Sequence, residues 1–179
     1  MSPMASFRVG DKVVYPNQGV GVIEHISRRD LGENGQEFYL LRIEASNLRV
    51  MVPLTSAANV GIRPVTGAAE ITPILGFLQC PDRFPCASDW KGRFRENSDK
   101  MRGGALAQVA EVLKSLVQLH HAKPLSFREK KMLDRAAMLL AAELASASNC
   151  SVDQAFERVQ ECLAKASLVL PPQSPENGR

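Results

Sequence analysis

Residues 7–26 read FRVGDKVVYPNQGVGVIEHI, and this stretch decides the fold of the amino-terminal part of the chain. The Val-Val-Tyr run at 13–15 is short, apolar and β-prone, and Pro16 ends it. Gly19 and Gly21 open a second apolar run, where glycines suit a sharply bent strand or a close approach of two backbones. The stretch therefore predicts two short strands joined by a turn.

Two further apolar runs, 38–43 and 48–53, follow at similar spacing. Asn34-Gly35 and Ser46-Asn47 punctuate them as hairpin turns. Short strands at this spacing, rich in valine and glycine, predict a closed or half-closed sheet. We expect a small β-barrel module over residues 1–65.

The pattern becomes helical after residue 65. Ile71-Thr-Pro73 interrupts the chain, so a short helix is expected only over 74–78. Ser88 is a candidate N-cap, with Asp89 in the first turn, for a helix that ends at Gly103-Gly104. The next helix carries one apolar stripe, formed by Leu106, Val109, Ala110, Leu113, Leu116, Val117 and His120.

Two capping boxes, Ser126 to Glu129 and Ser151 to Gln154, predict the starts of two more helices. None of the helices has an apolar face wide enough for burial on all sides, so we expect a compact bundle over 66–168. The proline-rich end, 169–179, is expected to be disordered. The predicted class is α+β, a β module followed by an all-helical bundle. The helix that begins after Ser126 carries an apolar stripe formed by Leu133, Ala136, Ala137, Leu140 and Leu144.

The composition is that of a globular protein, with 45% apolar and 23% charged residues and a formal net charge of +3. No run of about 18 apolar residues occurs, and the first residues lack the layout of a signal peptide, so we expect a cytoplasmic protein. The four cysteines and three histidines show no zinc spacing, so no metal or other cofactor is expected. No nucleotide loop, Gly-x-Ser-x-Gly or paired acid set supports an enzyme.

Positive charge is concentrated around the single tryptophan, Trp90. A lone tryptophan is usually a core residue, but Lys91, Arg93 and Arg95 crowd the same predicted helix. An apolar wedge framed by cations is what a minor-groove binder needs, because the cations hold phosphates while the ring presses on a distorted base step. We interpret Trp90 as such a wedge and Phe94 as core.

A second basic group lies on the helix that begins after Ser126 and includes Lys130 and Lys131. These residues are either the solvated face of the helix or a contact for one phosphate strand. In the β module, Pro53 at a strand end indicates an edge strand, which can pair with a partner's strand. The predicted partner-binding residues are Leu41, Arg49, Met51 and Pro53, with Arg28 and Arg29 at the rim.

These motifs resemble the CarD/CdnL family of bacterial transcription regulators. The same β module also occurs in the transcription-repair coupling factor, but this chain lacks the phosphate loop of that motor protein. In the first module the resemblance is carried by Phe7, Val9-Gly10-Asp11, Val14-Tyr15-Pro16, Gly19, Phe38-Tyr39, Arg49-Val-Met-Val-Pro53 and Val60-Gly61-Ile62-Arg63. In the second module it is carried by Trp90, Arg93-Phe94-Arg95, Val109-Ala-Glu-Val-Leu113, Leu125-Ser126 and Glu129-Lys-Lys-Met-Leu133.

The resemblance implies a Tudor-like first module that binds the β subunit of RNA polymerase. It also implies a helical module whose Trp90 lies at the upstream edge of melted promoter DNA and stabilises the open complex. The family usually has Arg-Arg where this chain has Gly92-Arg93, and a mid-helix glycine costs about 1 kcal/mol relative to alanine. Two alternatives stay open: a Tudor-like protein–protein adaptor without direct DNA contact, and an enzyme that uses cysteine or histidine.

Overall fold

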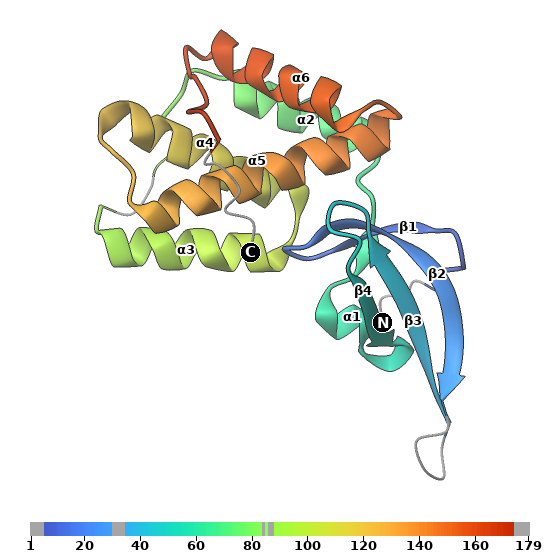
Figure 1. Ribbon diagram of the computed structural model, residues 1–179. Coiled ribbons are helices and arrows are strands. Elements are labelled where there is room, and N and C mark those ends of the chain that lie inside the picture. The colour runs from blue at the N-terminus through green and yellow to red at the C-terminus, as the bar shows by residue number, and fades with distance from the viewer. Residues whose placement is uncertain (1–5, 30–34, 84, 86–87, 174–179) are drawn as a thin grey trace. The chain divides into compact units, whose positions relative to one another are not determined.

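A computed structural model of the chain describes residues 6–29, 35–83, 85 and 88–173. The chain divides into two compact units, residues 1–65 and residues 66–179, which we call the β module and the helical module (Figure 1). The β module holds an antiparallel five-stranded sheet, and the helical module holds five helices in its described part. The predicted α+β class is confirmed.

The strands of the β module follow the apolar runs of the sequence. Their order across the sheet is β4-β3-β2-β1-β5, and each neighbouring pair is antiparallel. The ladder does not join β4 to β5 in the described residues, so both are edge strands. The elements are β1 (Lys12–Tyr15), β2 (Gly19–Arg29), β3 (Gln36–Ile43), β4 (Arg49–Pro53), the 3-10 helix η1 (Leu54–Ser56), α1 (Ala57–Val60) and β5 (Arg63–Pro64).

Backbone geometry explains several glycines and asparagines of the β module. Asn17 and Gly19, with φ of 59° and 100°, occupy the left-handed region in the β1–β2 turn. At Gly21, a Cβ atom would lie 3.0 Å from the carbonyl oxygen of Arg42 on β3, so the expected close backbone approach is present. Asn47 is left-handed in the β3–β4 turn, whereas the expected turn at Asn34 lies outside the described residues.

The helical module begins with a helix longer than its sequence pattern suggests. The interruption expected at Pro73 is wrong, because α2 runs over Ala68–Gln79 with Pro73 inside it. Proline removes one helical hydrogen bond, but four apolar residues of α2 face the core and outweigh that loss: Ile71, Ile74, Leu75 and Leu78. The remaining helices are α3 (Trp90–Gly103), α4 (Leu106–Ala122), α5 (Phe127–Ser148) and α6 (Val152–Lys165).

Helix α4 is the central element of the helical module. It packs against α2, α3 and α5, and α5 packs in turn against α6. The expectation that no helix is buried on all sides is wrong for α4, because residues 112–117 are buried without interruption. The run includes Lys114. Its Nζ donates a hydrogen bond of 2.7 Å to the backbone carbonyl of Phe77 and also lies 4.4 Å from the centre of the Phe77 ring. The charge is therefore satisfied although the side chain is enclosed.

Both predicted capping boxes are present, at Ser126 for α5 and at Ser151 for α6. The expected stripe of α5 is buried, from Leu133 to Leu144. Beyond α6 the structure describes residues 166–173, and the backbone N–H of Val169 donates to His121 Nε2 over 3.0 Å. The rest of the predicted disordered end, 174–179, lies outside the described residues. None of the described helices has the length and hydrophobicity that a membrane span requires.

Candidate functional site

The helix that carries the tryptophan starts one residue later than expected. Asp89, not Ser88, is the N-cap of α3, because Asp89 Oδ2 accepts a 2.7 Å hydrogen bond from the backbone N–H of Gly92. Aspartate at this position both satisfies an otherwise free N–H group and places a negative charge at the positive end of the helix. Trp90 therefore occupies the first position of α3.

Gly92 donates its backbone N–H to this cap. It lies in the first turn of α3 rather than in the helix interior. A Cβ atom at Gly92 would come within 2.7 Å of Asp89 Oδ1, so any larger residue requires the end of the Asp89 side chain to shift.

Trp90 is held on two sides and open on the rest. Its ring stacks on Phe94 with a centroid distance of 5.8 Å and an interplanar angle of 18°. Its indole Nε1–H donates to Ser126 Oγ over 3.3 Å, and 39% of the residue stays exposed. Phe94 is half-buried and does not belong to the core cluster, so the prediction of Phe94 as a core residue is wrong. The two rings form one aromatic surface.

Arg93 does not belong to that surface. The sequence predicts it as a DNA contact, but its side chain is only 4% exposed and pairs with Glu129 on α5, with Nη2 2.9 Å from Oε1. Burial raises the pKa of the Glu129 carboxyl, but hydrogen bonds from Ser126 and the Arg93 charge outweigh it and lower the pKa below its ordinary value. The pair is therefore charged in the interior, and Arg93 is corrected from a surface cation to a structural one.

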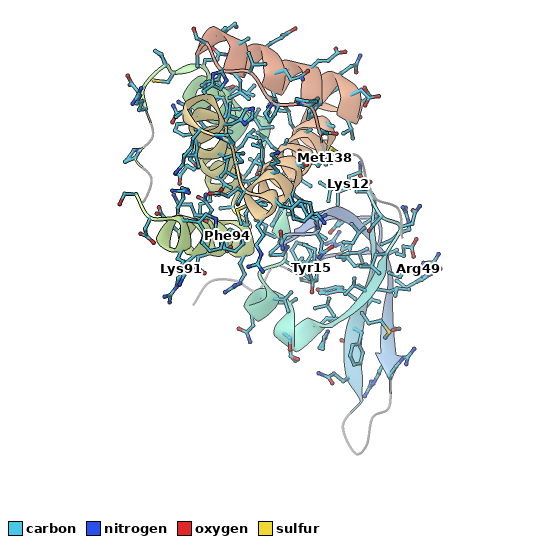
Figure 2. All side chains as sticks on the ribbon, turned by 60° about the vertical axis from the view of Figure 1, so that its left-hand side comes forward. Lys12, Tyr15, Arg49, Lys91, Phe94 and Met138 are labelled. Carbon is cyan, nitrogen blue, oxygen red and sulfur yellow. The ribbon has the colours of Figure 1, made fainter. Side chains whose placement is uncertain are left out.

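The other cations that the sequence predicts as DNA contacts come from two helices, α3 and α5. Lys91 and Arg95 stand four residues apart on α3 and are both exposed, and Lys91 points away from the rest of the helical module (Figure 2). On α5, Lys131 is exposed and its Nζ lies 4.8 Å from the centre of the Phe127 ring. Lys130 is exposed too, but it lines a separate hollow with Asp134 and His120. The structure thus gives Lys130 different surroundings from Lys131.

Phe127 is the residue that the sequence reasoning missed. It is the first residue of α5, follows Ser126 directly and is 68% exposed. It lies off the buried stripe of α5 and is followed by the basic residues 128, 130 and 131, a signal that could have identified it. We group Trp90, Lys91 and Arg95 of α3 with Phe127 and Lys131 of α5 as the wedge surface, because Phe127 directly follows Ser126, whose hydroxyl contacts the Trp90 indole.

In the β module, the strand register corrects one residue of the predicted partner-binding face. Opposite residues of an antiparallel pair share a face, and Met51 lies opposite Leu40, not Leu41. Leu41 is fully buried in the core, so its predicted contact with a partner is wrong. The outer face of β3 and β4 is made of Phe38, Leu40, Arg42, Arg49, Met51 and Pro53.

The predicted edge strand is present, since β4 ends the sheet, and Met51 on it is 38% exposed. Glu24 bridges Arg42 and Arg49, with N···O distances of 2.7 and 3.1 Å. The hydrogen bond from Arg42 lowers the pKa of the Glu24 carboxyl, with the charge of Arg49 acting in the same direction and desolvation against it. Arg49, which Figure 2 labels at the side of the sheet, is thus tied to Glu24, and the strand register puts it on the same face as Met51.

The two rim arginines lie at the end of β2 and are both exposed. Arg29 pairs with Gln36 and Arg28 with Glu37. Because successive residues of a strand point to opposite faces, Arg29 shares the face of Leu40 and Met51 and Arg28 does not. Among the described residues, no group of three or more histidine, cysteine or acidic side chains is placed to hold a metal ion.

Comparison with known proteins matches both modules. Residues 7–66 match the family model of the CarD-like/TRCF RID domain, and residues 74–160 match the model of the CarD C-terminal domain. The chain is also similar to "Putative transcription factor YdeB" of Bacillus subtilis (strain 168), with 37% identity over 140 residues, which are 77% of this chain and 90% of the Bacillus protein. With both domain models matched in order and a relative of this identity over most of its length, the chain belongs to the CarD family.

Proposed function

We propose that the chain is a transcription regulator that binds the β subunit of RNA polymerase through the β module and contacts promoter DNA through the wedge surface. The observation that carries the proposal is Trp90: a large aromatic residue, 39% exposed, at the start of a helix whose neighbouring exposed side chains are Lys91 and Arg95. Membership of the CarD family and the transcription-factor description of the Bacillus relative support a role in transcription.

The mechanism follows from the chemistry of the wedge surface. Lys91, Arg95 and Lys131 supply charges for phosphates, and Trp90 supplies an apolar face that presses against a base step. Unstacking a step in intact duplex costs about a few kcal/mol, and this cost falls where the strands are already separating. The wedge therefore acts at the edge of a melted region, where it slows reannealing and prolongs the open complex.

The β module supplies the second contact. Its outer face combines the apolar side chains of Phe38, Leu40 and Met51 with the charge of Arg49, next to the exposed edge of β4. An edge strand accepts a partner's strand through backbone hydrogen bonds, and the side chains beside it provide specificity. Binding to polymerase raises the effective concentration of the wedge surface near DNA, so neither contact needs high affinity alone.

The proposal is tested by photocrosslinking and by measuring the lifetime of polymerase–promoter complexes. A photoreactive amino acid in place of Lys91 is expected to crosslink to promoter DNA at the upstream edge of the bubble in a polymerase–promoter complex. Trp90→Ala is expected to shorten the lifetime of competitor-resistant complexes while polymerase binding is retained. Crosslinks to protein alone, with an unchanged lifetime, would support the adaptor function instead.

A further inference from the structure

We propose that Ser126 is a positioning residue for Trp90, and that the buried pair Arg93–Glu129 fixes Ser126 in that role. The inference rests on the proposed function, because it concerns how the wedge is held ready for DNA. It is carried by a hydrogen-bond network that joins the start of α3 to the start of α5.

The Ser126 hydroxyl uses its full hydrogen-bonding capacity. It donates to Glu129 Oε2 over 2.8 Å, and it accepts from the backbone N–H of Glu129 over 3.3 Å and from the Trp90 indole N–H over 3.3 Å. A hydroxyl has one donor and two acceptor sites, so no site is left over. Because the donor direction is set by Glu129, the lone pair that receives the indole is fixed as well.

The Glu129 carboxylate is saturated in the same way. Oε1 accepts from Arg93 Nε and Nη2, over 3.0 and 2.9 Å. Oε2 accepts from the backbone N–H and the hydroxyl of Ser126, over 3.0 and 2.8 Å. A carboxylate accepts about four hydrogen bonds. Both charged side chains are 4% exposed, so the arrangement is enclosed and its geometry is tightly constrained.

The network links the buried Arg93–Glu129 pair, through Ser126, to the partly exposed indole of Trp90. Arg93 lies one turn beyond Trp90 on α3, and its Nη1 also reaches the carbonyl of Ser88 before the helix, at 3.5 Å. Phe94 supports one face of the indole, and Ser126 supports its N–H edge. The orientation of the exposed remainder of the ring is thereby set before any DNA is bound. Ordering a side chain in advance reduces the entropy lost on binding.

The cap of α5 alone does not require this contact. Ser151 and Gln154 form the equivalent capping box of α6, with hydrogen bonds of 3.1 and 3.2 Å. Ser126 differs from Ser151 in that its hydroxyl also receives an indole N–H. Ser151→Ala is therefore a matched control, because it removes a helix cap of the same kind away from Trp90.

Fluorescence gives a direct readout, because Trp90 is the only tryptophan of the chain. In the free full-length protein, Ser126→Ala is expected to lower the anisotropy of tryptophan emission, because the indole loses one of its two supports. Ser126→Thr keeps a capping hydroxyl and is expected to restore the anisotropy. Ser151→Ala is expected to leave it unchanged.

The second readout is the lifetime of polymerase–promoter open complexes. Losing one hydrogen bond that orients the ring is expected to shorten the lifetime about 2- to 10-fold in Ser126→Ala. Ser126→Thr and Ser151→Ala are expected to behave as wild type. The proposal is overturned if Ser126→Ala leaves the anisotropy unchanged, or if its lifetime is normal while Trp90→Ala shortens it. A normal lifetime for Trp90→Ala itself overturns the proposed function, and the positioning role for DNA with it.

Discussion

Arg93 and Glu129, which stand 36 positions apart in the chain, form an ion pair inside the helical module with Nη2 2.9 Å from Oε1. Arg93 belongs to the first turns of α3, and Glu129 is the third residue of α5 and closes its capping box. The pair therefore joins two helix starts. Its carboxylate also orients Ser126, which contacts Trp90.

Glu129→Gln is expected to destabilise the helical module strongly. The variant leaves the Arg93 guanidinium buried without its counter-charge, and breaking one partner of a buried pair typically costs about 3–5 kcal/mol. Urea unfolding of the full chain followed by circular dichroism measures the change. Arg102→Ala is the control, because Arg102 pairs with Asp99 in an exposed i,i+3 contact that contributes about 0–1 kcal/mol. Equal stability of the two variants would contradict the structural role of the pair.

Stability is expected to fall in acid through the same carboxyl. The folded-state pKa of Glu129 is lowered below its ordinary value of 4.5, so the unfolded chain binds more protons than the folded one below that pH. The stabilisation from Glu129 is complete above pH 4.5 and is lost as the pH falls through the lowered pKa. Urea titrations from neutral pH down to about pH 3 should show a steeper loss for wild type than for Glu129→Gln. If the free energies of unfolding of wild type and Glu129→Gln fall in parallel with pH, the acid sensitivity comes from other carboxyl groups.

Gly92→Ala is expected to stabilise α3 by less than the about 1 kcal/mol by which alanine is the better helix former. The added Cβ forces the end of the Asp89 side chain to shift, and this weakens a cap that is worth about 0.5–2 kcal/mol. In an Asp89→Ala background the same change is expected to stabilise the protein by the full amount, because no cap is left to weaken. Thermal unfolding of the four proteins in this cycle measures the difference, and equal effects of Gly92→Ala in both backgrounds would contradict the coupling.

Met51→Glu is expected to weaken capture of the RNA polymerase β subunit without changing the fold. Met51 is exposed on the edge strand, so the new charge is tolerated in the free protein but opposes an apolar contact in the complex. Val9→Glu is the control, because it puts the same charge at an exposed apolar residue outside β3 and β4. Pull-down of the β subunit measures the effect, and capture equal to wild type would remove the outer face from the proposed interface.

Phe127→Ala is expected to shorten the open-complex lifetime with little effect on stability. The ring is 68% exposed, so its removal takes little apolar area out of the core. Stacking of an aromatic ring on a base is worth about 1–3 kcal/mol where it occurs. Met138→Ala, at another exposed apolar position of α5, is the control. If both variants show the wild-type lifetime, Phe127 is not part of the wedge surface.

Local signals in the sequence predicted much of the secondary structure. The four apolar runs became strands, and the capping boxes at Ser126 and Ser151 begin α5 and α6. These features depend on residues a few positions apart, whose hydrogen bonds and periodicity are readable along the chain. The same signals marked Trp90 as unusual, because lysine and arginine surround it in the sequence.

The tertiary structure alone decided which side chains of each pattern face outward. The strand register places Leu40 opposite Met51 and buries the next residue, Leu41, because successive side chains of a strand point to opposite faces. Arg93 is buried together with a partner from another helix, Glu129. No spacing of residues along the chain predicts that pairing. The sequence by itself therefore determined most of the strands and helices and the basic surroundings of Trp90. Folding decided which cations stay in solvent, because the stability of a buried charge depends on partners that only the packed helices bring together.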